Sequence, residues 1–296
     1  MAHARMNAAV GDRPGPARAR RGPAGGEARR GPERPPSAEW LYGRHAVFEA
    51  LRAGRRRVHQ VLIGQGVKQQ AGIIGEILAM ARQRGCPVGE VARAALEVVG
   101  PVNHQGVIAE VGPYPYVDLA GIAAADEAPL YLVLDHLQDV QNLGTLLRTA
   151  EAMAVTGVIL PERRAAGITP AVVNASAGAV EHLRIAAVVN LVQALAQLKR
   201  ANVWIVGLDA TPGAVPLPRA DLSGALALVV GAEGAGLSRL VRETCDWLLA
   251  IPMYGMVGSL NAAVAGSIAL VAARQAREGP PKGQDGRFLR AQYPHI

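Results

Sequence analysis

The strongest constraint on the fold is a regular alternation of short apolar runs with longer amphipathic stretches across residues 130–277. Runs rich in Val, Ile and Leu predict strands, and stretches with apolar residues three or four positions apart predict helices. The predicted strands are 130–134, 155–160, 183–188, 203–208, 225–230 and 247–251, and the predicted helices are 142–153, 169–175, 191–200, 237–244 and 260–277. This alternation predicts an α/β fold with a mostly parallel sheet that helices cover on both faces.

Two glycine-rich loops follow the last two predicted strands, at 231–236 and 252–258. Each loop leads into a predicted helix. Open α/β sheets bind their ligands at the carboxyl ends of the strands, where such loops lie. The two loops therefore predict one shared ligand site.

Three segments carry a more specific signal. They are 135–150 (DHLQDVQNLGTLLRTA), 231–237 (GAEGAGL) and 251–261 (IPMYGMVGSLN). In this order and at this spacing they resemble the signature motifs of the SpoU/TrmH (SPOUT) RNA ribose 2'-O-methyltransferases. The resemblance extends over about residues 40–277.

The resemblance implies properties that the residue pattern alone does not give. It implies a deep trefoil knot in the C-terminal part, S-adenosylmethionine as the methyl donor, an RNA substrate and a homodimer. Pattern alone favours a Rossmann-like domain, because true knots are nearly absent from proteins. A dinucleotide-dependent dehydrogenase is disfavoured, because no G-x-G-x-x-G follows the strand predicted at 130–134.

A ribose 2'-hydroxyl is a weak nucleophile, so its methylation requires in-line placement and a proton acceptor. The resemblance places Arg148 beside the target ribose and implies that it accepts or relays the proton. Because the pKa of arginine lies above about 12, we expect Arg148 to orient the ribose-phosphate, with the general-base role as a hypothesis. Asn142, six residues earlier, is expected both to cap the helix and to take part in the site.

The other catalytic candidates lie in the two loops. Glu233, between glycines, is expected to orient Arg148 or a substrate group. Ser259 and Asn261 open the last predicted helix, with Ser259 either an N-cap or a side chain near the arginine. The family usually has a second serine two residues after this asparagine, but Ala263 stands here, so a site hydroxyl is absent.

The cofactor candidates are expected to act mainly through their main chain. By resemblance, Gly231, Ile251 and Leu260 cradle the adenine and methionine parts of S-adenosylmethionine. Met253 is expected to line the same pocket. No metal is needed for this chemistry, and no cluster of metal-ligand residues is indicated.

A smaller module is predicted at 39–112, with short helices at 43–51, 72–84 and 94–99 and strands at 58–63, 88–91 and 106–111. It resembles the L30e-like substrate-binding domain of the family's 23S rRNA branch, through the segments 43–46 (GRHA) and 104–107 (HQGV). Arginines 55–57 form either a phosphate contact or, as the preferred interpretation, a charged turn. The lone histidines His45 and His104 are interpreted as structural.

A linker is predicted at 113–129, stiff at its start because of its prolines. Its two tyrosines, Tyr114 and Tyr116, either stack on bases or, as preferred, pack one domain against the other. A further segment, 174–183 (NASAGAVEHL), resembles the rRNA branch. Its Glu181 and His182 are expected to organise a loop at the dimer and RNA face rather than to catalyse.

The two ends of the chain are predicted to be tails, at 1–38 and 278–296. Residues 1–38 hold eight of the arginines and three acidic residues, so most of the formal charge of +7 is concentrated there. Too few bulky apolar residues are present to offset the ordering entropy, so this tail is predicted to be disordered. It is either a polyanion-binding arm or a solvated extension.

The two cysteines, Cys86 and Cys245, form no CxxC and indicate neither a disulfide framework nor a zinc site. The longest apolar run, 262–273, is interrupted by Gly and Ser and is too short for a bilayer. With no signal-peptide core at the N-terminus, the chain is predicted to be soluble and cytoplasmic.

The resemblance to the 23S rRNA branch implies 2'-O-methylation of a guanosine ribose in the peptidyl-transferase P loop of 23S rRNA. Two alternatives stay open: a tRNA guanosine 2'-O-methyltransferase and a non-catalytic ribosome-assembly factor. The front module disfavours the tRNA enzyme, because that branch generally lacks it. Intact Asn142, Arg148, Glu233 and Asn261 disfavour the non-catalytic factor, and Ala263 mildly favours it.

Overall fold

The computed structural model describes residues 38–68, 72–122 and 128–278, which belong to one compact unit. The predictions for residues 1–37 and 279–296 lie outside the described residues.

The N-terminal module, residues 39–111, is built around a four-stranded sheet in the order β1-β4-β2-β3. The helices α1 and α2 pack on it through buried side chains such as Val47, Leu51 and Ile77. The predicted helices and strands are present, and β1 is an additional strand that was not predicted. The elements are β1 (Glu39–Tyr42), α1 (Arg44–Ala53), β2 (Val58–Gly64), α2 (Gly72–Gln83), β3 (Val88–Val91), the 3-10 helix η1 (Arg93–Val99) and β4 (Val107–Val111).

The larger part of the chain forms a seven-stranded sheet in the order β7-β6-β5-β10-β8-β11-β9, and all its neighbouring strands are parallel. The predicted parallel sheet is thereby confirmed. Four short elements, α3, β9 and the 3-10 helices η2 and η3, were not predicted. The elements are α3 (Leu119–Ile122), β5 (Leu130–Asp135), α4 (Val140–Ala152), β6 (Gly157–Pro161), α5 (Pro170–Ala175), the 3-10 helix η2 (Ala179–His182), β7 (Ile185–Val188), α6 (Leu191–Arg200), β8 (Trp204–Leu208), β9 (Val215–Pro216), the 3-10 helix η3 (Leu217–Arg219), β10 (Leu226–Gly231), α7 (Arg239–Thr244), β11 (Trp247–Ala250) and α8 (Ala262–Glu278).

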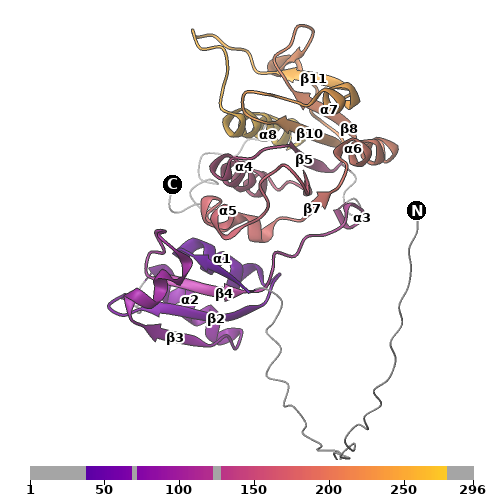
Figure 1. Ribbon diagram of the computed structural model, residues 1–296. Helices are drawn as coiled ribbons and strands as arrows, with labels where there is room; N and C mark the ends of the chain where they lie inside the picture. Colours follow the sequence, from indigo (N-terminus) through magenta and orange to yellow (C-terminus); the bar gives the residue numbers. More distant parts are fainter. Residues whose placement is uncertain (1–37, 69–71, 123–127, 279–296) are drawn as a thin grey trace, which may run out of the picture. The chain divides into compact units, whose positions relative to one another are not determined.

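Helices cover the large sheet on both faces, as Figure 1 shows, with α4, α5 and α8 on one side and α6 and α7 on the other. Successive residues of a strand face opposite ways. Leu132 of β5 therefore packs in the first layer, and Val133 packs in the second. Because both faces are covered, every residue of β5 and β10 is buried, which explains their continuous apolar runs.

The strand order brings together segments that lie far apart in the sequence. β10 lies between β5 and β8, and Gly231 pairs with Asp135 at the carboxyl ends of their strands. The helix α4 leaves this edge after β5, and the loop before α7 leaves it after β10. The first two sequence motifs therefore begin side by side.

The N-terminal module contacts the larger part of the chain through two arginines in the turn between α1 and β2. Arg55 donates hydrogen bonds to the carbonyl oxygens of Glu181 and Leu183, and Arg56 forms a buried ion pair with Glu181. Burial raises the pKa of Tyr114, whose hydroxyl donates to the carbonyl oxygen of Leu183 at 2.8 Å. Tyr114 thus packs the two parts together, as the preferred interpretation expected.

Glu181 and His182 turn toward the N-terminal module. His182 pairs with Glu49 of α1, at 2.7 Å between Nε2 and Oε2. The ring of His104 accepts a hydrogen bond from the amide of Gly106 at 3.0 Å, a turn contact that supports its structural interpretation.

Both cysteines are free thiols, as expected from their spacing. Burial raises the pKa of the Cys245 thiol to about 12, so this thiol stays protonated and unreactive at neutral pH. In the part of the chain that the structure describes, no helix has the length and apolar character needed to span a membrane.

Candidate active site at the carboxyl ends of the strands

The helix α4 starts at the carboxyl ends of the parallel strands, directly after β5. Its N-cap is not Asn142, the residue that was expected to cap it. Asp139, and not Asn142, is the N-cap, because its carboxylate accepts a hydrogen bond from the amide of Asn142 at 2.7 Å. Asn142 lies in the first turn, with a helical backbone. Its side chain is therefore free to take part in the site.

The structure joins three of the predicted catalytic residues in one hydrogen-bonded chain. The side-chain nitrogen Nδ2 of Asn142 donates a hydrogen bond to a carboxylate oxygen of Glu233 at 2.8 Å. The amide oxygen of Asn142 accepts from the side chain of Asn261, also at 2.8 Å. Each of the three residues comes from a different sequence motif. These side-chain hydrogen bonds therefore connect the starts of α4 and α8 to the loop after β10.

Asn261 also caps α8, the role that the sequence analysis considered for Ser259. Its side-chain oxygen accepts hydrogen bonds from the amides of Ala263 and Val264, at 2.9 and 3.3 Å. Ser259 is exposed, and within the described ranges no hydrogen bond joins its side chain to Asn142 or Glu233. Ala263 is buried in the hydrophobic core beneath the cap, at 1% exposure.

The loop after β10 folds tightly on itself. The main chains of Ala232 and Gly236 exchange hydrogen bonds of 3.1 and 2.9 Å. A Cβ atom at Gly231 would lie 2.2 Å from the carbonyl carbon of Gly236, so only glycine fits at this position. Gly234 and Gly236 adopt positive φ, which side chains disfavour.

Asp135, the last residue of β5, holds this loop against the first motif. It is buried, at 1% exposure, and its carboxylate accepts a hydrogen bond from the amide of Ser238 at 2.6 Å. Its other oxygen contacts the ring of His136 at 2.6 Å, and His136 has a positive φ of 59°. The sequence analysis included Asp135 in a motif but gave it no role.

Asp209 was missed by the sequence analysis. It follows β8, the strand between β10 and β11, and so lies between the two glycine-rich loops. Its carboxylate pairs with Arg242 of α7 at 2.6 Å and lies 3.9 Å from the Cβ position of Gly236. An aspartate directly after a predicted strand was the signal that could have revealed it.

The third sequence motif, residues 251–261, which contains the second glycine-rich loop, presents apolar side chains to solvent. Ile251, Met253 and Leu260 are half-buried along it. Between them, Tyr254 and Met256 are almost fully exposed, at 92% and 103%. Exposed large apolar groups beside a polar network are typical of a binding surface.

Arg148 is not joined to the other candidates within one chain. It lies about 9 Å further along α4 than Asn142 and on a different side of the helix. Its side chain is exposed, and no ion pair or hydrogen bond is found for it among the described residues. The site within one chain therefore holds Asn142, Glu233 and Asn261, and Arg148 faces outward.

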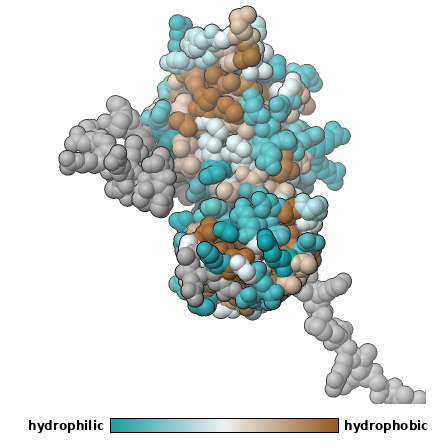
Figure 2. Space-filling view, turned by 90° about the vertical axis from the view of Figure 1, so that its left-hand side faces the viewer, coloured by the Kyte–Doolittle hydropathy of each residue, from teal (hydrophilic) through white to brown (hydrophobic). Residues whose placement is uncertain are grey.

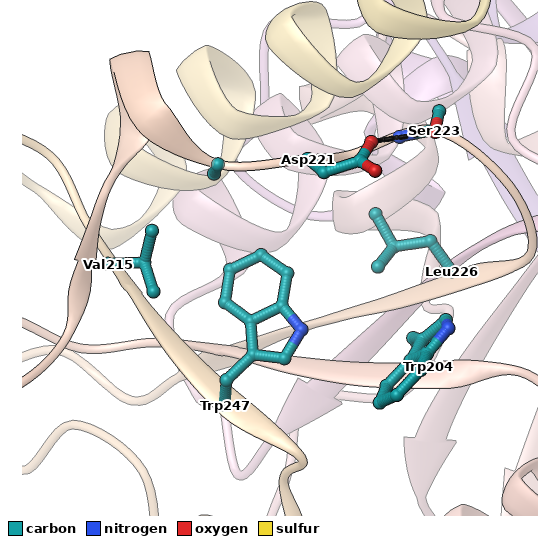
Figure 3. Close-up of a pocket in the computed structure, with 7 residues that line it drawn as sticks. Trp204, Val215, Asp221, Ser223, Leu226 and Trp247 are labelled. Atoms are coloured by element: carbon teal, nitrogen blue, oxygen red, sulfur yellow. Dashed lines mark hydrogen bonds between the residues drawn. The ribbon is translucent and has the colours of Figure 1, made fainter.

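A separate hollow of about 390 Å³ lies at the other end of the strands of the large sheet, away from the candidate site. It is lined by the first residues of three parallel strands, Trp204, Leu226 and Trp247, and so lies at their amino ends. Figure 3 shows the two indole rings below Asp221, whose carboxylate accepts from the hydroxyl of Ser223 at 2.6 Å. No predicted site residue lines this hollow.

Known protein families match both parts of the chain. Residues 129–271 match the SpoU rRNA Methylase family, and residues 40–117 match the RNA 2'-O ribose methyltransferase substrate-binding family. The Bacillus subtilis protein YacO, whose name assigns it provisionally to the TrmH family of tRNA/rRNA methyltransferases, is 38% identical over 234 residues. That alignment covers 78% of this chain and 92% of YacO.

Solved structures show the same fold. The SpoU methyltransferase AviRb from Streptomyces viridochromogenes superposes with a TM-score of 0.68 and 27% identity, over 81% of this chain and 90% of AviRb. An AdoMet-bound rRNA methyltransferase from Sinorhizobium meliloti superposes with a TM-score of 0.67 and 28% identity, over 80% of this chain and 87% of that chain.

Proposed function

Because the chain belongs to the SpoU/TrmH family of RNA methyltransferases, we propose that it methylates the 2'-hydroxyl of a ribose in RNA. The observation that carries this proposal is the hydrogen-bonded chain of Asn142, Glu233 and Asn261. It places the three family motifs around one edge of the sheet.

The family uses S-adenosylmethionine, which supplies an electrophilic methyl group on a sulfonium when it is bound. The residues at the carboxyl edge fit this cofactor. The tight loop at Gly231 offers main-chain groups, and the half-buried side chains of Ile251, Met253 and Leu260 offer apolar surface. The carboxylate of Asp209 can accept hydrogen bonds from hydroxyl or ammonium groups.

In this proposal the residues of the site position the reactants. Asn142, whose side chain Asn261 holds, donates to the carboxylate of Glu233 at the edge of the sheet, where this carboxylate orients the ribose or the arginine. Arg148 orients the ribose-phosphate through its planar guanidinium, which matches phosphate oxygens. The general-base role of Arg148 stays a hypothesis.

The proposed target is a guanosine in the P loop of 23S rRNA. The match of residues 40–117 to a substrate-binding family supports a large RNA substrate, because this module adds a second surface for RNA. A tRNA guanosine is the second candidate, and the name of YacO leaves both RNA classes open.

A homodimer is part of the proposal, and a surface of α8 supports it. Val264, Ile268 and Val271 recur on one face of this helix and are exposed at 44%, 38% and 36%. Figure 2 shows hydrophobic surface gathered on this side of the molecule, the side of α4 and α8. A second copy on this face would cover these side chains and lie close to Arg148.

We expect Ile268→Glu to convert the dimer into a monomer and to abolish methyl transfer, because a buried, unpaired carboxylate opposes association. Light scattering coupled to size exclusion gives the mass. Val189→Glu, at a position 82% exposed away from this face, is the matched control and should stay dimeric. A wild-type protein that elutes as a monomer would contradict the dimer.

Two further parts of the interpretation stay proposals. One is the division into a module at 39–112, a linker at 113–129 and a methyltransferase domain at 130–277. The other is the deep trefoil knot implied by the family resemblance.

The proposed function is tested by incubating the protein with labelled S-adenosylmethionine and separate pools of tRNA and 23S rRNA. A 2'-O-methyl group removes the hydroxyl that attacks the next phosphate, so the modified linkage resists alkali. We expect label in alkali-resistant linkages of 23S rRNA. Label in tRNA alone would favour the second candidate. RNA binding without any label would favour an assembly factor.

A further inference from the structure

The three arginines at 55–57, between α1 and β2, have different surroundings in the structure. Arg55 and Arg56 turn inward, where Arg55 donates to main-chain carbonyl oxygens and Arg56 pairs with Glu181 and Glu39. Arg57 stays exposed. The charged-turn interpretation therefore holds for the first two arginines and leaves the third without a structural role.

A hollow of about 600 Å³ opens beside this turn, at the end of the N-terminal module where α1 and α2 finish. Its lining includes Arg55, Arg56, Arg57 and Arg84 together with His59, and no carboxylate side chain among the described residues lines it. Glu181 and Glu39 offset Arg56. Within the described ranges, no carboxylate forms an ion pair with Arg57 or Arg84.

Arg84 is held in place at the rim of this hollow. One of its nitrogens donates to the carbonyl oxygen of Arg52 at 3.1 Å, in the last turn of α1. Its guanidinium lies against Gly54, where a Cβ atom would stand 2.3 Å from Nη1. The missing side chain of Gly54 thus makes room for the guanidinium, whose other N–H groups stay available to a ligand.

We propose that this hollow binds phosphates of the RNA backbone, through Arg57 and Arg84. The inference rests on the proposed function. It adds an RNA contact in the N-terminal module, away from the candidate active site at the carboxyl ends of the strands. Guanidinium groups match phosphate oxygens in pairs, and two arginines without a carboxylate partner beside an open hollow suit a polyanion better than a single small anion.

The location connects this contact to the catalytic candidates. The same turn reaches η2 through Arg55 and Arg56. η2 in turn packs against α4, the helix of Asn142 and Arg148. RNA held at the turn is therefore bound to a part of the module that contacts η2, the 3-10 helix beside α4.

The test uses the full-length protein and a labelled 23S rRNA transcript, with affinity measured by fluorescence anisotropy over a range of salt concentrations. For the double variant R57Q/R84Q we expect about tenfold weaker binding and a salt slope smaller by about 2, since each lost phosphate contact removes close to one unit. The KM for RNA should rise, while kcat at saturating RNA and the affinity for S-adenosylmethionine stay unchanged.

Two control variants separate phosphate contacts from general charge and from folding. R200Q/R219Q removes the same charge at exposed positions on α6 and η3 and should leave the salt slope unchanged. R57K/R84K keeps both charges and should retain most of the affinity, with a thermal midpoint like that of the wild type.

The possible outcomes distinguish this inference from the proposed function. If the wild type methylates RNA and R57Q/R84Q binds RNA with an unchanged slope, the inference is overturned and the proposed function stands. If R57Q/R84Q loses RNA affinity but the wild type methylates no RNA, the inference stands and the proposed function fails. Inorganic phosphate that binds at micromolar concentration, with RNA affinity unchanged in R57Q/R84Q, would indicate a small-anion site and overturn the inference.

Discussion

Arg148→Ala is expected to lower kcat for methyl transfer by about 100-fold or more at saturating RNA, with little change in cofactor affinity. An arginine that orients the ribose-phosphate acts on the placement of the nucleophile, and misplacement by about 1 Å can cost this much. Arg148 is exposed and joined to no described residue, so its removal should leave the fold intact. Single-turnover methyl transfer with labelled cofactor measures the rate.

Two variants define what the arginine contributes. Arg148→Lys keeps the charge but lacks the planar fork, so we expect only partial recovery of the rate. Arg200→Ala removes an exposed arginine from the end of α6 and should leave kcat unchanged. Turnover of Arg148→Ala within a factor of about three of the wild type would end the proposed role.

Co-expression of Arg148→Ala with a Gly231→Ala chain tests whether Arg148 serves the partner subunit. Gly231→Ala disrupts the loop after β10, because its Cβ would overlap the main chain of Gly236. If Arg148 acts across the dimer, each mixed dimer contains one complete site of its two, so purified mixed dimers should show roughly half of the wild-type rate. Random pairing makes half of the dimers mixed, so the unseparated pool should show roughly a quarter. No recovery in purified mixed dimers would place Arg148 in its own chain's site.

Glu181→Gln is expected to lower the free energy of unfolding by about 3 kcal/mol. The side chains of Arg56 and Glu181 are 2% and 1% exposed, and removing one partner of a buried pair leaves an uncompensated charge. Burial raises the pKa of Glu181 while Arg56 lowers it, so the carboxylate depends on this arginine for its charge. Arg56 keeps its contact with Glu39, which limits the loss.

Urea unfolding, followed by circular dichroism, measures this change. The double variant R56M/E181L removes both charges and should recover most of the lost stability, because neither desolvated charge remains. Glu243→Gln, at an exposed pair with Arg239 on α7, is the matched control and should change stability by less than about 0.5 kcal/mol. A double variant as unstable as E181Q would show that the pair acts through shape rather than charge.

Sequence periodicity was enough to predict the larger sheet. Strands such as β5 and β10 are continuous apolar runs because helices cover both faces of the sheet, so their burial can be recognised in the sequence. Short elements carry no such signal. β9 and α3 were missed because two residues of a strand and four residues of a helix are too few to show a period. β1 was also missed, although β3, a strand of the same length, was predicted.

The motifs named the candidate residues, but they did not give their contacts. Asn142 and Ser259 were both considered as helix caps, and the structure gives these caps to Asp139 and Asn261. Several polar residues near a helix start can each serve as the cap, and the local backbone decides between them. Asp209 was overlooked because its position directly after a strand was the only signal, and it belongs to none of the three motifs.

The sequence by itself determined the α/β class, the residues of the two glycine-rich loops and the family, because each depends on local periodicity or on short motifs. The tertiary structure decided which residues meet: the chain from Glu233 through Asn142 to Asn261, the division of the arginine run and the outward position of Arg148. Strand order produces these contacts, since β10 must lie beside β5 before their carboxyl ends can share an edge. Strand order is a property of the whole sheet, and no single segment of the sequence specifies it.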